Sequence, residues 1–183
     1  MTQGYETQPY QVIKKYDRFE LRYYPPAQMV TAESPLSSNQ NFNLLFQYIS
    51  GANADNLKIP MTTPVHMSQN SGQKKMSFVL PKQLTEPPLP KNQRVQLTQS
   101  KAAYFVAIQY GGYSNSNKTA YYTDALKKAL LEEGFKPLGT PINLGYNSPY
   151  KFFNRRNEIL FEVDFSESNS HSSIPFIPPK KSN

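Results

Sequence analysis

Residues 41–81 have the sequence NFNLLFQYISGANADNLKIPMTTPVHMSQNSGQKKMSFVLP, in which one helix pattern is followed by two strand patterns. Four apolar side chains recur at the i, i+3, i+4 and i+7 spacing of one helix face, namely Phe42, Leu45, Phe46 and Ile49. This spacing predicts a helix over about 39–50, which Gly51 can end. Two extended runs follow at about 59–67 and 76–80, and both have the composition of strands.

The same order of elements recurs in the second half of the chain. The sequence predicts a second helix at about 117–133. It predicts strands around this helix, at about 95–97, 104–110, 142–147 and 159–165. With the alternating strand that begins at Phe19, each of the segments 18–81 and 95–165 then has two strands, a helix and two strands. Because neither half can bury its apolar face alone, we expect the two halves to pack against each other.

We therefore predict an α+β domain over residues 1–165. In it, two pseudo-symmetric repeats form a curved antiparallel sheet or distorted barrel with two outer helices. Six large apolar side chains are expected to be mostly buried: Phe42, Phe46, Phe78, Leu126, Leu130 and Phe161. Residues 166–183 are rich in Ser and Pro, and we predict a tail that is either mobile or weakly docked through its few apolar residues.

The composition excludes several classes of protein. The 183 residues contain no Cys, which excludes disulfides, thiolate nucleophiles and Cys-ligated metals. Only two His are present, His66 and His171, so a His-rich metal site is excluded. The sequence has no apolar run long enough to span a membrane and no secretory signal pattern at its start, and we therefore expect a cytoplasmic protein.

The chain is basic, with a formal net charge of +7. An excess of positive charge favours anionic partners such as nucleic acid, an acidic membrane surface or a ligand that carries carboxylates. No nucleic-acid-binding motif accompanies the charge, and the basic residues are scattered as pairs. We therefore expect a small-molecule partner and no nucleic acid, while the oligomeric state stays open.

Two side chains are candidate ligands for a haem iron. A single imidazole can ligate a haem axially, because the porphyrin supplies the other four nitrogens, and His66 is such an imidazole. Tyr23 is the weaker alternative, because a Tyr phenolate can also ligate ferric haem. Both residues also have a purely structural interpretation, His66 as a hydrogen-bonded residue and Tyr23 as a strand residue that packs beside Leu21.

The segment YNSPYKFFNRR, residues 146–156, combines aromatic rings with cations. A flat tetrapyrrole needs an apolar platform and positive charges for its carboxylates. The candidate binding residues of this segment are Tyr146, Tyr150, Lys151, Phe152, Arg155 and Arg156. The same composition can stack on single-stranded bases, or the rings can fill the core while the cations face solvent.

Seven stretches together resemble the SOUL family of haem-binding proteins. They are FELRYYPPAQMV (19–30), LLFQYISGAN (44–53), KIPMTTPV (58–65), MSFVLP (76–81), IQYGGYS (108–114), LGYNSPY (144–150) and RRNEILF (155–161). They follow the family's order and spacing and cover about 10–164. The resemblance implies a distorted barrel of two repeats with two helices, in agreement with the repeat that the residue pattern indicates.

The resemblance also implies reversible, non-covalent binding of b-type haem or another tetrapyrrole at a shallow surface site, as a carrier or buffer. By analogy with family members, the first helix, through Leu45 and Tyr48, and the 146–156 segment form this site. Some members have a His ligand where this chain has Tyr23. Between Ser38 and Asn53 the sequence has no Lys or Arg, so the propionates would pair with Lys151, Arg155 or Arg156.

Two alternative functions remain. The first is a small-molecule effector-binding module of the same repeat architecture, in which Glu20 or Glu158 would receive a cationic ligand. The second is an enzyme that acts on tetrapyrroles, for which His66 is the available imidazole within the predicted domain. The sequence leaves open whether any catalysis occurs.

Overall fold

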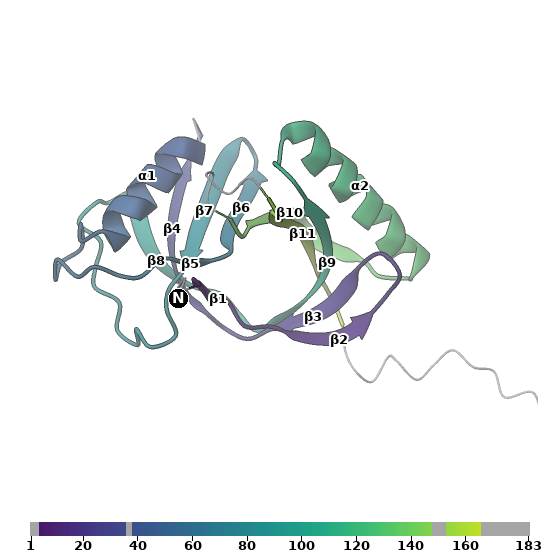
Figure 1. The fold of residues 1–183 in the computed structure, drawn as a ribbon, viewed down its shortest axis with the longest axis horizontal. Coiled ribbons are helices and arrows are strands. Elements are labelled where there is room, and N and C mark those ends of the chain that lie inside the picture. The colour runs from purple at the N-terminus through teal and green to yellow at the C-terminus, as the bar shows by residue number, and fades with distance from the viewer. Residues whose placement is uncertain (1–3, 36–37, 148–152, 166–183) are drawn as a thin grey trace, which may run out of the picture.

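A nine-stranded antiparallel sheet and two helices form the framework of the molecule (Figure 1). The structure is a computed structural model, and it describes residues 4–35, 38–147 and 153–165. Its helices are α1 (Ser38–Ile49) and α2 (Ser116–Glu132). The strands are β1 (Glu6–Thr7), β2 (Gln11–Lys15), β3 (Glu20–Tyr24), β4 (Gln28–Ser34), β5 (Thr62–Thr63), β6 (Val65–Asn70), β7 (Gln73–Val79), β8 (Val95–Gln99), β9 (Ala103–Gly111), β10 (Pro137–Gly145) and β11 (Arg156–Val163).

The large sheet is curved but open. Its strand order is β2-β3-β9-β11-β10-β6-β7-β4-β8, and β1 and β5 form a separate parallel pair. The expected α+β class, antiparallel sheet and two helices are confirmed, and no closed barrel forms among the described strands. Outward from the β6–β10 pair, the order is β6-β7-β4-β8 on one side and β10-β11-β9-β3-β2 on the other. Superposition of the two halves stays a prediction.

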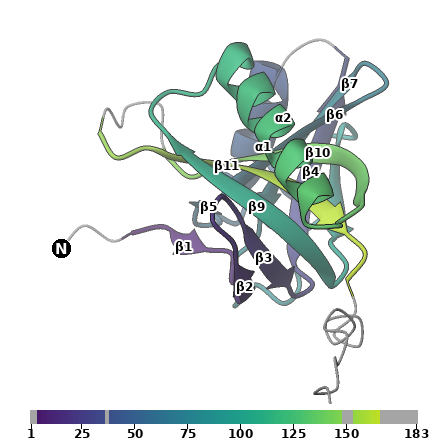
Figure 2. The same ribbon diagram turned by 90° about the vertical axis from the view of Figure 1, so that its right-hand side faces the viewer.

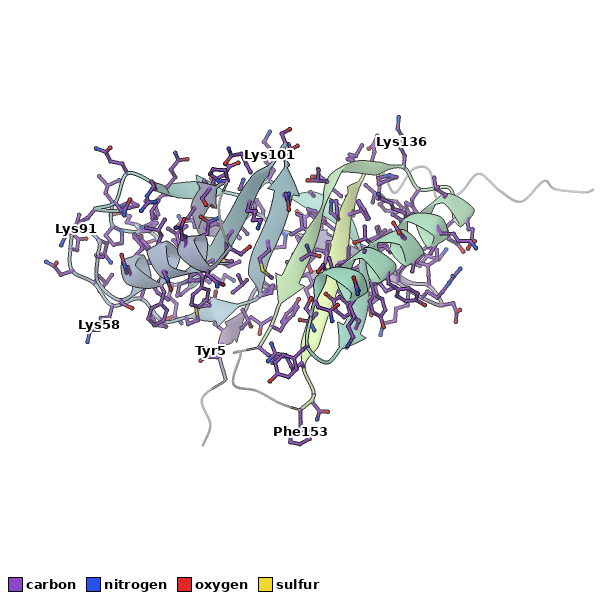
Figure 3. All side chains as sticks on the ribbon, turned by 90° about the horizontal axis from the view of Figure 1, so that it is seen from above. Tyr5, Lys58, Lys91, Lys101, Lys136 and Phe153 are labelled. Carbon is purple, nitrogen blue, oxygen red and sulfur yellow. The ribbon has the colours of Figure 1, made fainter. Side chains whose placement is uncertain are left out.

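Both helices cover the outer, convex side of the sheet. Helix α1 packs on β4, β7 and β8 through a core that includes Val30, Leu45 and Phe78. Helix α2 packs on β9, β10 and β11, as the side view in Figure 2 shows, and its core includes Leu126, Leu130 and Phe161. The strands β6 and β10 lie between the two helices, as the view from above shows (Figure 3).

A third core cluster lies on the opposite, concave side of the sheet. It contains Tyr24, Ala107, Leu144, Tyr146 and Leu160. The strands in the middle of the sheet are therefore buried on both faces, one under a helix and the other in the concave interior. The alternation of Phe19, Leu21 and Tyr23 with Glu20, Arg22 and Tyr24 is typical of a half-buried strand. The structure buries side chains of both faces, Leu21 on one and Arg22 and Tyr24 on the other.

One of the six expected core residues is not buried. Phe78, Leu126, Leu130 and Phe161 are buried and Phe42 is partly so, but the side chain of Phe46 is 50% exposed. Successive helix residues are about 100° apart, and α1 is turned so that Leu44, Leu45 and Tyr48 point at the sheet. This rotation leaves Phe46 at the solvent edge of the apolar stripe.

Candidate functional site

An open hollow of about 440 Å³ lies beside the C-terminal end of α1. It is lined by Phe46, Ile49, Ser50, Lys58, Ile59 and Met61. The exposed ring of Phe46 stacks on Phe42, with ring centroids 6.0 Å apart and an interplanar angle of 12°. Lys58 is the cation of this lining, and its side chain points away from the body of the molecule in Figure 3. The hollow therefore combines apolar surface with a positive charge.

A buried Asn fixes the turn that brings Lys58 and Ile59 beside the helix. The Asn53 Nδ2 atom donates to the carbonyl oxygens of Tyr48, at 2.9 Å, and Leu57, at 2.7 Å. Its Oδ1 atom accepts from the Leu57 backbone N–H at 2.9 Å. Just beyond the turn, the Ile59 N–H donates to the Ile49 carbonyl at 2.8 Å. These bonds hold the segment against the end of α1, because they satisfy backbone groups that would otherwise be buried unpaired.

The apolar surface continues from this hollow toward the middle of the sheet. Phe42, Met61, Val65 and Met67 are partly buried and pack against the α1 core. Met67 lies next to Gly145 at the end of β10, where an added Cβ would stand 3.4 Å from its Cε atom. We call the strip formed by Phe42, Phe46, Met61, Val65 and Met67 the α1 platform.

The two residues predicted to contact a ligand from the first helix are not on this platform. Leu45 is 0% exposed and Tyr48 is 1% exposed, and both face the sheet. The Tyr48 hydroxyl donates to the Pro88 carbonyl at 2.8 Å. The expectation that they form an open surface is therefore corrected, because the same rotation of α1 that exposes Phe46 turns them inward. In the sequence, Phe46 stands at the edge of the apolar stripe of the first helix, and this position is the signal that could have indicated the exposed α1 platform.

The structure places three of the six predicted residues of the 146–156 segment, and Tyr150, Lys151 and Phe152 lie outside the described residues. Tyr146 and Arg156 come together, with the guanidinium 4.1 Å from the ring centroid. Arg155 lies apart from them, with its guanidinium 4.4 Å from the Tyr113 ring centroid.

Arg156 belongs to a buried charge network centred on Glu158. The Glu158 carboxylate is 0% exposed. It accepts from both terminal nitrogens of Arg22, at 2.8 and 3.1 Å, from Arg156 Nη2 at 2.8 Å and from the Tyr146 hydroxyl at 2.9 Å. Both carboxylate oxygens are thus already engaged, and the charge of Arg156 is paired within the protein. Glu20 also belongs to this network, because its carboxylate accepts from Arg22 Nε at 2.8 Å.

The network sets the charge states of its members. Burial alone would raise the pKa of Glu158, but the hydrogen bonds and charges of Arg22 and Arg156 outweigh it and hold that pKa below its usual value. Burial raises the pKa of Tyr24 to about 12, and it also raises the pKa of Tyr146. Glu158 is therefore ionised at neutral pH and both phenols are neutral.

The two candidate iron ligands lie on opposite faces of the sheet. His66 is on β6 and faces the concave interior, where its Nε2 atom donates to Gln8 Oε1 at 2.7 Å. Burial lowers the pKa of this imidazole to about 4. Tyr23 shares the convex face with Leu21, and its ring centroid is 5.3 Å from that of Tyr104. The two side chains therefore cannot approach the same ligand.

The uncharged His66 predicts a pH dependence of stability. An unfolded His titrates near 6.5. As the pH falls from about 6.5 toward 4, the unfolded state binds a proton that the folded state does not, so the free energy of unfolding should decrease. Denaturant unfolding of His66→Gln should show a shallower decrease in this window. The prediction would be contradicted if the free energy of unfolding decreased equally steeply with falling pH in the wild type and in the variant.

Comparison with known proteins identifies the family. The model of the family described as "SOUL heme-binding protein" matches residues 5–162, most of the chain. The chain belongs to the SOUL family. This confirms the resemblance inferred from its motifs.

Named relatives agree with the SOUL assignment. Heme-binding protein 1 of Sus scrofa is 24% identical over 173 residues, which cover 84% of this chain and 90% of that protein. Heme-binding protein 2 of Homo sapiens is 28% identical over 156 residues, which cover 77% and 76%.

Solved structures share the fold of this SOUL chain. The C-terminal domain of EcmrR superposes with a TM-score of 0.60 at 14% identity, over 85% of this chain and 98% of that one. A hydrolase from Listeria innocua gives a TM-score of 0.58 at 10% identity, over 83% and 94%. At such low identities the likeness concerns the fold alone.

Two features are absent from the described part of this SOUL protein. No helix there is long and apolar enough to cross a membrane. The described residues also contain no group of three or more His, Asp or Glu side chains placed to hold a metal ion.

Proposed function

We propose that this SOUL-family chain binds haem or a related tetrapyrrole reversibly and non-covalently on the α1 platform, as a carrier or buffer. The observation that carries the proposal is the half-exposed Phe46 beside Met61 and Lys58 in an open hollow. An exposed aromatic ring next to apolar side chains and one cation suits a flat macrocycle that carries carboxylates. Membership of the family supports the choice of ligand.

The apolar side chains supply most of the affinity in this proposal. Burial of apolar surface contributes roughly 25 cal/mol per Å², so a macrocycle face laid on Phe42, Phe46 and Met61 gains several kcal/mol. Lys58 pairs with a propionate, but its exposure limits that contribution to about 1 kcal/mol. Because the α1 platform would cover only one face of the macrocycle, the binding it supports should be reversible.

Iron ligation by His66 or Tyr23 is not needed in this proposal. His66 points to the concave side of the sheet, whereas the neighbouring Val65 and Met67 pack on the α1 side. Tyr23 on β3 packs beside Tyr104 of β9, a strand on which α2 packs. Among the predicted cations, Lys151 and Arg155 remain candidates for a second propionate, and Arg156 does not, because it pairs with Glu158.

A matched pair of substitutions tests the platform. Phe46→Glu places a carboxylate where the macrocycle would rest, and it should weaken haem binding by about tenfold or more in an absorbance titration. Tyr121→Glu makes a comparable change at a 69% exposed aromatic residue on α2, and it should leave the affinity within about twofold of wild type.

Both variants should remain folded, because each changes a side chain that is at least half exposed. Circular dichroism melting checks this directly. Wild-type haem affinity in a folded Phe46→Glu protein would refute the platform.

A further inference from the structure

A second cavity, of about 300 Å³, lies on the concave side of the sheet. Its walls are largely apolar and come from distant parts of the chain, with Met29 on β4, Phe105 on β9, and Ile142 and Leu160 on β10 and β11. The sheet separates this cavity from the α1 platform, because the wall residues alternate with those that face the helices. The proposed tetrapyrrole function makes no use of it.

The interior of this cavity carries no charge from His66. The His66 imidazole is neutral near pH 7 and donates to Gln8 Oε1 at 2.7 Å. The Ser77 hydroxyl, which also lines the cavity, is hydrogen-bonded to Thr31 at 2.8 Å. Polar groups that are already paired neither demand nor repel a charged ligand group. The deeper part of the cavity therefore suits the apolar part of a ligand.

Three exposed charged side chains also line the cavity: Lys75, Lys101 and Glu162. None of the three has an opposite charge within 4.0 Å among the described residues. Lys101 lies at the edge of the molecule in Figure 3, on the connection between β8 and β9. With two ammonium groups against one carboxylate, the open side of the cavity has a net positive charge, which favours an anionic group there.

We propose that this cavity binds a small monocarboxylate with an apolar body. The carboxylate lies at the open side near Lys75 and Lys101, and the apolar body lies against Met29, Phe105 and Leu160. A volume of about 300 Å³ is at the lower end for small-molecule pockets, and it is too small for a tetrapyrrole. The chain would thus have two ligand sites, one on each side of the sheet.

Two probes that differ only in the sign of their charge test the proposal. Isothermal titration calorimetry with octanoate should give saturable binding, and octylammonium should bind about tenfold more weakly. Lys75→Gln combined with Lys101→Gln should weaken octanoate binding by about three- to tenfold, because each exposed lysine contributes up to about 1 kcal/mol. Lys128→Gln with Lys136→Gln removes the same charge from exposed positions that do not line the cavity and should have little effect.

A steric pair locates the ligand. Ala103→Leu adds volume at a lining residue and should abolish octanoate binding, whereas Ala102→Leu, at an exposed neighbour outside the lining, should not. Saturating haem should leave the octanoate affinity unchanged. Absence of octanoate binding, a preference for octylammonium, or an unaffected Ala103→Leu protein would each overturn the proposal, and displacement of octanoate by haem would overturn the separation of the two sites. The octanoate, octylammonium and Ala103→Leu results do not depend on whether haem binds to the α1 platform, whereas the haem competition applies only if it does.

Discussion

Glu158→Gln should lower the free energy of unfolding by about 3–5 kcal/mol. The substitution keeps the size of the side chain but removes the charge that compensates Arg22, which is 3% exposed, and Arg156. Arg22 keeps its partly exposed partner Glu20, but the two guanidiniums lose the buried carboxylate that they share, so the cost of their desolvation remains while most of the attraction that offset it is lost. Denaturant unfolding near pH 7 measures the loss.

A surface pair provides the control for this prediction. Arg18 and Glu132 form an ion pair of 2.7 Å, with side chains that are 52% and 48% exposed. Glu132→Gln should therefore cost less than about 1 kcal/mol, although its distance matches that of the buried pair. Equal losses for Glu158→Gln and Glu132→Gln would show that burial of the Glu158 network has no energetic consequence, contrary to the prediction.

The pH dependence of the network follows from the lowered pKa of Glu158. A carboxyl group whose pKa is lower in the folded state contributes stability above its unfolded pKa and loses it as the pH falls through the folded value. The contribution of Glu158 is therefore complete at neutral pH and lost in acid. The difference in stability between wild type and Glu158→Gln should accordingly shrink below about pH 4.

Leu45→Asp should cost more than about 4 kcal/mol and leave much of the chain unfolded. Removal of a buried Leu side chain alone costs about 2–5 kcal/mol, and the added carboxylate has no polar partner in the α1 core around Val30 and Phe78. A typical domain has only about 5–15 kcal/mol of stability. Haem binding should disappear together with the folded state, as followed by circular dichroism and denaturant unfolding.

Substitutions at two neighbouring positions on α1 serve as controls for Leu45→Asp. Gln47→Asp introduces the same side chain at an exposed position and should cost about 1 kcal/mol or less. Phe46→Glu should lose haem affinity while the protein stays folded, because Phe46 faces solvent. If Leu45→Asp remained as stable as Gln47→Asp, the orientation of α1, with Leu45 toward the sheet and Gln47 toward solvent, would be wrong.

The local elements of this fold were largely predictable from the sequence. Both helices were expected within about one residue of their ends, because the 3.6-residue period of apolar side chains is a local signal. The antiparallel strands followed from short extended runs separated by turns. The rotation of α1 about its axis was not predictable, because it depends on how Leu45 and Tyr48 pack against a sheet assembled from distant segments.

The charge network around Glu158 could not be predicted from the sequence either. Arg22 and Glu158 are 136 positions apart, and they meet because β3 and β11 both pair with β9. Arg22 occupies the polar position of an alternating strand, so the pattern indicated a solvent-exposed side chain. In the structure Arg22 is buried instead, with the Tyr10 ring centroid 4.2 Å from its guanidinium. For the same reason, the sequence placed Arg156 among the candidate propionate partners, whereas the structure pairs it with Glu158.

An absorbance titration of the folded protein with haem, repeated with metal-free protoporphyrin, tests the proposed function most directly. We predict saturable one-to-one binding of both compounds with similar affinities, because apolar contact with the α1 platform supplies most of the binding energy and iron ligation does not. Absence of saturable haem binding by the folded wild type would contradict the proposed function, and binding that requires the iron would contradict the platform as its main source of affinity.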